Sequence, residues 1–330
     1  MLYSSLKLFN LNQPILIFGR DGQIGKSLQE YFNHLKVPVI FLGRLDCDLS
    51  DELAIKKILN HYSPSIIINA AAYTEVDKAE SEIQLAFAVN AKAPEVMARY
   101  IANVPHGILV HYSTDYVFGD TKKTAYFETD STGPIEKLSI YGQSKLAGEK
   151  AVEEVFNFGQ DSRYASAQDN LSRYFILRTS WVYGDGGNFI LTMLRLAAEK
   201  DQLRVVCDQL GVPTSAKWLA EIGVQIANSK SESGIYHAVP DGKTSWYELA
   251  IFIIEVAASV GRRVKVNEKN IFPIPAIDYP LPAKRPYNSS INNSKLKRAL
   301  SKLEFSRQYP HWQEQVEDYV RHHVIFNIKN

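Results

Sequence analysis

The chain has 330 residues, a net charge of +1 and 45% hydrophobic residues. This composition predicts a globular protein with one large domain or two, and without a basic run it indicates neither nucleic acid nor an anionic membrane as partner. No stretch reaches the roughly 20 apolar residues of a membrane span, and residues 1–13 do not resemble a signal peptide. Cys47 and Cys207 lack metal-type spacing, which is typical of a cytoplasmic protein.

A short apolar run at residues 14–18 precedes a glycine-rich turn. The turn holds Gly19, Gly22 and Gly25 in G-x-x-G-x-x-G spacing, and a helix is expected to follow over residues 26–32. Such glycines permit a tight turn and close approach to a pyrophosphate, which rests on the positive end of the helix. A glycine turn that binds nothing is the alternative, but the flanking strand and helix favour a dinucleotide site.

The second apolar run, residues 37–42, ends at Gly43 and Arg44. This place lies about twenty residues past the glycines, where the adenosine ribose of a dinucleotide is expected. An acid there would hold a 2′-hydroxyl, whereas an arginine can pair with a 2′-phosphate. Arg44 therefore favours NADPH. The nearby Asp46 and Asp48 leave NADH open, and a solvated surface arginine is the competing interpretation.

The next predicted elements are strands at residues 65–69 and 106–113 and a helix at 83–103. Small residues follow the first of these strands, in the motif AAAYT at 70–74. They would let the chain run close under a cofactor, or they simply pack tightly. Thr114 and Asp115 follow the other strand, at the carboxyl edge where an open parallel sheet binds its ligands.

Tyr141 and Lys145 are four residues apart, so they share one face of the helix that Tyr141 opens. An ammonium close to a phenol lowers the tyrosine pKa from about 10. Such a tyrosine can exchange a proton with a carbonyl or alcohol oxygen near neutral pH. With a nicotinamide to carry hydride, the pair predicts a carbonyl reductase. Because such pairs also occur in ordinary amphipathic helices, the glycine turn upstream is what favours catalysis.

Strand and helix patterns alternate through the first half of the chain, which predicts an α/β fold with a doubly wound parallel Rossmann sheet. A fifth strand at residues 174–179 follows a polar stretch, 158–172, interpreted as a surface loop. A proline-rich stretch at 273–286 is expected to form a pocket wall. Residues 1–180 would form the NAD(P)-binding domain. Residues 181–330, apart from a segment that returns to it, would form a smaller α/β substrate-binding domain.

Eight motifs occur in this order: GRDGQIG, INAAAYTEVDKAE, HYSTDYVF, IYGQSKLAGEKAV, LRTSWVYG, NFILTMLRLAAE, DQLGVPTS and RPYNSS. Over about residues 14–325 they resemble the dTDP-4-dehydrorhamnose reductases of the extended short-chain dehydrogenase/reductase superfamily. HYSTDYVF, TSWVYG and DQLGVPT are specific to that branch, while the glycine turn and Tyr-x-x-x-Lys occur across the superfamily. The resemblance implies NAD(P)H-dependent reduction of the C4 ketone of dTDP-6-deoxy-L-lyxo-4-hexulose, giving dTDP-L-rhamnose.

The resemblance also implies roles for single residues. Tyr141 would donate the proton, Lys145 would hold the nicotinamide ribose and tune Tyr141, and Thr114 would hydrogen-bond the substrate carbonyl. Further substrate contacts would come from Asp115, Trp181 and Arg285, the last on the phosphates. The complete cofactor site would comprise Gly19, Gly22, Gln23, Ile24, Gly25, Arg44, Asp48, Leu49, Ala72, Tyr73, Thr74, Tyr141 and Lys145.

Some members of this family bind magnesium through glutamates across a dimer interface. The aligned positions here carry Ser27 and Lys217, neither of which is a hard carboxylate ligand. The sequence therefore predicts no metal. A homodimer remains compatible with the resemblance.

Three other functions use related chains. A sugar-nucleotide dehydratase needs an acid directly after the aspartate, and Tyr116, which follows Asp115, supplies none. A reductase of a related dTDP-keto-sugar, of the dihydrostreptose type, needs the same residues and stays open. A non-catalytic NADP-binding regulatory subunit of the methionine adenosyltransferase type also stays open, although the intact Thr114, Tyr141 and Lys145 favour the enzyme.

Replacing Arg44 tests the prediction of cofactor choice. Arg44→Ala should raise the KM for NADPH far more than the KM for NADH, because it removes a charge-assisted bond worth about 1.5–3 kcal/mol. Steady-state kinetics with each cofactor measures the difference. Equal effects on both cofactors would make Arg44 a bystander.

Overall fold

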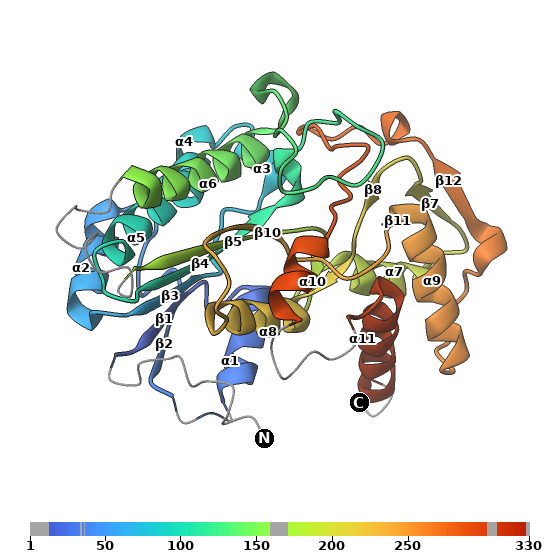
Figure 1. Cartoon of the computed structure of the whole chain (residues 1–330). Helices are drawn as coiled ribbons and strands as arrows, with labels where there is room; N and C mark the ends of the chain where they lie inside the picture. The colour runs from blue at the N-terminus through green and yellow to red at the C-terminus, as the bar shows by residue number, and fades with distance from the viewer. Residues whose placement is uncertain (1–12, 34, 36, 159–170, 302–308, 328–330) are drawn as a thin grey trace.

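The computed structural model describes residues 13–33, 35, 37–158, 171–301 and 309–327 (Figure 1). The surface loop predicted at 158–172 lies outside these ranges except at its two ends. Among the described residues, no helix combines the length and apolar character needed to cross a membrane.

A six-stranded parallel sheet forms the centre of the larger lobe, as the alternation of strand and helix predicted (Figure 1). Its strands, in spatial order, are β10 (Gly234–His237), β5 (Arg173–Thr179), β4 (Ile108–Thr114), β3 (Ile66–Asn69), β1 (Ile15–Phe18) and β2 (Val39–Leu42). The order reverses at β1, which pairs with β2 on one side and β3 on the other. In register, Phe18 lies beside Leu42 and Asn69. The glycine turn, the end of β2 and the segment after β3 therefore meet at the carboxyl edge of this switch point.

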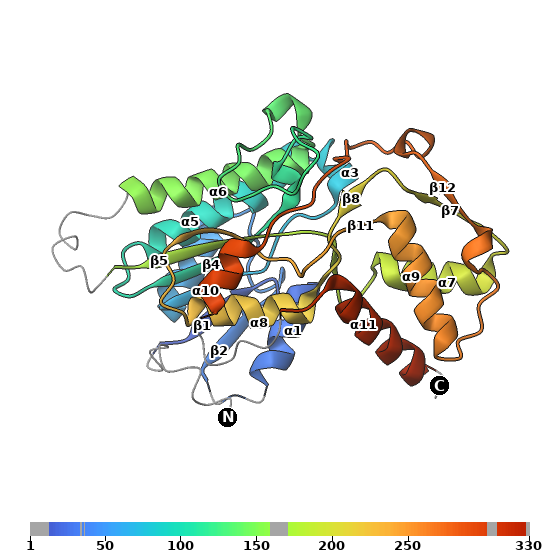
Figure 2. The same cartoon turned by 45° about the vertical axis from the view of Figure 1, so that its right-hand side comes forward.

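Helices cover both faces of the sheet, which explains why its strands are continuous apolar runs. Ile15 and Ile17 pack in the core that includes residues of α1, α8 and α10, whereas Leu16 and Phe18 pack in the core shared with α2, α5 and α6. The helices are α1 (Gln23–Phe32), α8 (Ala216–Ala227) and α10 (Ser294–Leu300) on one side, and α2 (Glu52–Tyr62), α5 (Ala93–Ile101) and α6 (Ile140–Phe158) on the other (Figures 1 and 2).

The helix predicted at residues 83–103 is confirmed, but it is not uniform. It consists of α4 (Ile83–Phe87), a π-helical segment (Ala88–Lys92) and α5. The widened turn holds the buried side chain of Asn90, and such π-helical turns are frequent at functional sites. The short helix α3 (Val76–Ala79) precedes it.

The smaller lobe lies to the right of the sheet in Figures 1 and 2, and its hydrophobic core also includes residues of the larger lobe, among them Val117, Phe118 and Leu146. Its helices are α7 (Phe189–Glu199), α9 (Trp246–Ser259) and α11 (Trp312–Asn327), and its paired strands are β7 (Leu203–Val206) with β12 (Ile271–Ile274), β6 (Val182–Tyr183) with β9 (Thr214–Ser215), and β8 (Leu210–Gly211) with β11 (Thr244–Ser245). Ser245 caps α9 in a reciprocal capping box with Glu248. Between these elements the chain returns to the large sheet through α8 and β10.

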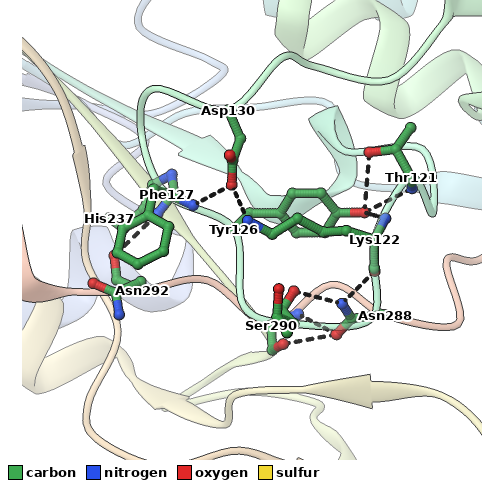
Figure 3. A network of polar contacts seen from close by, with 10 residues as sticks. Thr121, Lys122, Tyr126, Phe127, Asp130, His237, Asn288, Ser290 and Asn292 are labelled. Atoms are coloured by element: carbon green, nitrogen blue, oxygen red, sulfur yellow. Dashed lines mark hydrogen bonds and ion pairs between the residues drawn. The ribbon is translucent and has the colours of Figure 1, made fainter.

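A polar network fastens the loop between β4 and α6 to the segment after β12 (Figure 3). The Tyr126 ring stacks on Phe118, and its hydroxyl accepts hydrogen bonds from the backbone N–H groups of Thr121 (2.8 Å) and Lys122 (3.1 Å). Asn288 donates to the Lys122 carbonyl at 2.9 Å. The loop therefore depends on contacts with residues more than 160 positions later in the chain.

A buried ion pair joins α6 to β5 and generates a stability prediction. The Glu149 carboxylate accepts from Arg178 Nη2 at 2.7 Å and Nε at 3.0 Å, with side chains only 1% and 3% exposed. Glu149→Gln leaves the guanidinium buried without a countercharge, so the free energy of unfolding should fall by about 3–5 kcal/mol. Denaturant unfolding measures this loss, with Glu154→Gln on the exposed side of α6 as control. A loss no larger than the control's would contradict the prediction.

Candidate active site

The start of α6 faces the end of β4, which brings two predicted site residues together. Tyr141 lies in the first turn of α6, close enough to Thr114, the last residue of β4, for that hydroxyl to influence its pKa. The first turn is held in place by Glu80, whose carboxylate accepts from the Ile140 N–H at 2.9 Å, and by Ser139, which accepts from the Gly142 N–H. These contacts satisfy N–H groups that a helix start leaves open.

The predicted lowering of the Tyr141 pKa by Lys145 is wrong for this structure. Burial raises the pKa of Tyr141 to about 12, the hydrogen bond with Thr114 opposes the rise, and the charge of Asp115 adds to it. The Lys145 ammonium instead donates to the Tyr112 carbonyl at 2.7 Å and lies 3.3 Å from His111 Nε2. Tyr141 is therefore protonated at neutral pH, the form that a proton donor requires.

Lys145 is almost completely buried, at 1% exposure. Burial lowers its pKa to about 8, and the negative charge of Glu149 opposes that shift. Glu149 lies one turn further along α6, and Arg178 is its ion-pair partner. Tyr141, Lys145 and Glu149 thus follow one face of the helix at intervals of four residues.

Asp115 is buried beside Thr114 and is held by hydroxyl groups. Ser180 donates to its carboxylate at 2.6 Å and Thr114 at 3.1 Å. Burial raises the pKa of Asp115 to about 6, against the lowering by these hydrogen bonds. The carboxyl group therefore titrates close to neutral pH.

Trp181, directly after Ser180, is held by residues of the smaller lobe. Its backbone is left-handed, with φ of 41°, a strained conformation for a bulky residue. Its ring stacks on Trp246 with centroids 3.5 Å apart, and a Cβ on Gly211 would come within 2.3 Å of the indole. Only glycine therefore fits at position 211. The substrate contact predicted for Trp181 stays a prediction.

The glycine turn fits a bound pyrophosphate. Gly19 has φ of +92°, and a Cβ there would lie 2.6 Å from the backbone of Ala70 and Ala71. A Cβ on Gly25 would lie 1.9 Å from the Gly19 carbonyl oxygen. Gly22 precedes α1 and leaves the first N–H groups of that helix open to an anion.

Among the other residues of the predicted cofactor site, one has a free polar atom and two belong to the hydrophobic cores. Gln23 begins α1, and its side-chain oxygen is buried with no partner among the described residues, so it is available to a ligand. Ile24 packs against the sheet core, and Leu49 is buried in the core on the opposite face. These two apolar side chains hold the backbone of the site.

Two arginines lie close to the end of β2: Arg44 follows this strand, and Arg20 follows β1. Arg44 is exposed, and its charge helps the hydrogen bonds from Ser50 to lower the pKa of Asp48. Arg20, inside the glycine turn, pairs with Asp46 at 2.8 Å. The sequence analysis missed Arg20, although its position between Gly19 and Gly22 placed it near the cofactor.

Asn90 connects the predicted cofactor segment to α6. Its side chain accepts from the Tyr73 N–H at 2.8 Å and donates to the Tyr73 carbonyl at 3.0 Å. It also donates to Ser144 Oγ, between Tyr141 and Lys145, at 3.0 Å. Ala72 and Thr74, on either side of Tyr73, are held at this place by the same bonds. No sequence pattern pointed to Asn90.

A cavity of about 380 Å³ opens beside this site. It includes Tyr116, whose ring meets the Tyr141 ring edge to face at a centroid distance of 5.9 Å. The proline-rich stretch supplies half of its lining residues, in keeping with the predicted pocket wall: Ala276, Ile277, Tyr279, Pro280, Leu281, Ala283, Lys284, Arg285 and Pro286. Arg285 lies at this wall in a bidentate ion pair with Asp77 of α3.

Ser27 and Lys217 lie on α1 and α8. Within the described ranges, no three side chains of the His, Cys, Asp or Glu type gather where they could hold a metal ion.

The open parallel sheet, the glycine turn and the grouping of Thr114, Tyr141 and Lys145 define a member of the short-chain dehydrogenase/reductase superfamily. The chain belongs to the RmlD substrate binding domain family, whose model matches residues 13–325. It is 39% identical to the dTDP-4-dehydrorhamnose reductase of Escherichia coli K12, over 91% of this chain and 94% of that protein.

Solved structures agree with this membership. A dTDP-4-dehydrorhamnose reductase from Clostridium acetobutylicum superposes with a TM-score of 0.77 at 33% identity, covering 93% of this chain and 98% of that one. The Bacillus anthracis dTDP-4-dehydrorhamnose reductase in complex with NADP gives a TM-score of 0.76 at 32% identity, with the same coverage.

Replacing Tyr141 by phenylalanine tests its role as proton donor. Tyr141→Phe removes the acidic hydroxyl and keeps the ring, so kcat should fall by about 10² to 10⁴-fold. Cofactor affinity, measured by titration of NADPH fluorescence, should stay at the wild-type value because the glycine turn is untouched. Near-full activity of the variant would remove Tyr141 from the mechanism.

Proposed function

We propose that this protein is a dTDP-4-dehydrorhamnose reductase, which reduces the C4 ketone of dTDP-6-deoxy-L-lyxo-4-hexulose to dTDP-L-rhamnose with NADPH. The observation that carries the proposal is the grouping of Tyr141, in the first turn of α6, with Thr114, the last residue of β4, at the carboxyl edge of the sheet. It places an acidic hydroxyl and a second hydroxyl where one carbonyl oxygen can contact both. The named activity of the relatives supports the same substrate class.

The chemistry requires a hydride at carbon and a proton at oxygen. The nicotinamide supplies the hydride when bound. Tyr141 is held protonated by burial, since its pKa is raised to about 12, and it gives its proton to the C4 oxygen as negative charge develops there. Thr114, whose hydroxyl donates to Asp115 in this structure, would turn its O–H to the same oxygen and stabilise that charge.

Lys145 stabilises the tyrosinate that proton transfer leaves behind. Its pKa, lowered by burial to about 8, keeps it mostly protonated at neutral pH, so a positive charge lies one helical turn from the donor. In the proposal Lys145 also holds the nicotinamide ribose. Asp115 and Trp181 would contact the sugar nucleotide, and Arg285 its phosphates.

The cofactor assignment combines three observations. The glycine turn has no room for side chains at positions 19 and 25, as close approach to a pyrophosphate requires. Arg20 is paired with Asp21 and Asp46, whereas Arg44 is exposed after β2, and a free arginine there favours a 2′-phosphate over a 2′-hydroxyl. A relative of the same family has been solved with NADP. NADPH is therefore the proposed cofactor, with NADH as the alternative.

The proposal includes the organisation of the chain. Residues 1–180, with the returning α8 and β10, would bind the cofactor, and the rest of residues 181–330 would bind the substrate. Most members of the hydrophobic cluster that packs α7, α9 and α11 together come from residues 181–330, which supports this division. The proposal also includes a homodimer. It includes a cytoplasmic location as well, in keeping with the free thiols of Cys47 and Cys207.

A turnover assay tests the function directly. The purified protein is mixed with NADPH and enzymatically generated dTDP-4-keto-sugar, cofactor oxidation is followed by absorbance, and the product sugar is identified. Formation of dTDP-L-rhamnose is expected, and dTDP-glucose, which has no ketone, serves as the control substrate. A different product sugar would favour the related-reductase alternative. NADPH binding without turnover would favour the regulatory-subunit alternative.

A further inference from the structure

The ion pair between Asp77 and Arg285 joins the two lobes at the cavity wall. The Asp77 carboxylate accepts from Arg285 Nη1 at 2.7 Å and from Nη2 at 2.8 Å. It also accepts from the Ala283 N–H at 3.0 Å, while the Ala283 carbonyl accepts from Arg285 Nη1 at 2.8 Å. One carboxylate therefore fixes both the guanidinium and the backbone two residues before it.

These bonds occupy the end of the guanidinium where Nη1 and Nη2 lie, and they leave its side edge without a partner in the described part of the chain. Arginine has five N–H groups in a rigid plane, and in the described part of the chain Asp77 and Ala283 engage three of them. The Nε–H and one Nη2–H remain, and they lie together on the side edge, which can bind two oxygens of a phosphate in parallel. The Arg285 side chain lines the cavity and is only 16% exposed.

Asp77 itself is fixed relative to the reacting groups. Its helix, α3, follows directly after Tyr73 and Thr74, and Asn90 ties the Tyr73 backbone to α6. Three residues after Asp77, Glu80 accepts from the first N–H of α6. A side chain held by Asp77 is therefore positioned against α6 and the cofactor segment. By contrast, the wall residues 277–282 that precede Arg285 are exposed and lie outside any long helix or strand.

We infer that Asp77 is a positioning residue that aims the free edge of Arg285 at the diphosphate of the sugar nucleotide. This inference rests on the proposed function. The ion pair has no net charge, so Arg285 can attract a diphosphate only through the N–H donors that Asp77 leaves free and holds in a fixed orientation. The end-on pairing keeps the arginine oriented and leaves two N–H donors for the ligand.

Binding of dTDP to the NADPH-saturated protein, measured by calorimetry, tests the inference without requiring turnover. Asp77→Asn keeps the size of the side chain and removes its charge, so the Kd for dTDP should rise by roughly ten- to a hundredfold, the range for a lost charge-assisted bond. The KM of the keto-sugar nucleotide should rise in proportion, with a much smaller change in kcat. Glu75→Gln, which breaks the exposed pair with Lys78 in the same segment, should match the wild type.

A double-mutant cycle separates positioning from a structural role. Arg285→Ala should weaken dTDP binding, and adding Asp77→Asn to it should weaken binding no further, since Asp77 acts through Arg285. The Kd for NADPH and the Tm should follow the Glu75→Gln control. Unchanged dTDP affinity in Asp77→Asn, or additive losses in the double variant, would overturn the inference. Absence of turnover by a wild type that binds dTDP would instead count against the proposed function alone.

Discussion

The charge of Arg178 is buried beneath α6 and must be balanced there, and the Glu149 carboxylate that balances it determines where the helix lies. A bidentate contact with both side chains at most 3% exposed has little freedom to shift. Because Lys145 and Tyr141 occupy the same face one and two turns earlier, their positions follow from that contact. Ser113 donates to the same carboxylate at 2.5 Å, which ties α6 to the end of β4 as well.

Desolvation then sets the protonation of the site. It raises the pKa of Asp115 to about 6 and lowers that of Lys145 to about 8, so both groups titrate near neutral pH. Burial also raises the pKa of Tyr141 to about 12. A site that kept this tyrosine as a phenolate before the reaction would need a lowered pKa instead. The site is thus arranged to deliver a proton, as reduction of a ketone requires.

The two lobes meet at the site through a small number of specific contacts. Trp181 is held between Trp246 and Gly211 of the smaller lobe, while the adjacent Ser180 donates to Asp115 at the sheet edge. Arg285 reaches back to Asp77 from the cavity wall. Both contacts join a substrate-side residue to the cofactor-side lobe, so the geometry of the site depends on how the lobes are assembled.

The amino-acid sequence by itself determined the sheet, the glycine turn and the helical face that carries Tyr141 and Lys145. These features depend on local periodicity: both faces of the sheet are buried, so its strands are apolar throughout, and a spacing of four residues defines one side of a helix. The proline-rich wall was also expected from local composition.

Only the tertiary structure decided the rest. Asn90 forms a hydrogen bond with Ser144, which lies 54 positions later in the chain, and Asp77 forms an ion pair with Arg285, which lies 208 positions later. No local sequence pattern predicts contacts over such separations. The pKa of Tyr141 was predicted in the wrong direction for the same reason. The i, i+4 spacing brings a lysine near, but the depth of burial and the carbonyl that draws the ammonium away are properties of the packed chain. Hydrogen-bond partners and the depth of burial depend on which distant segments pack together, and this packing exists only in the folded chain.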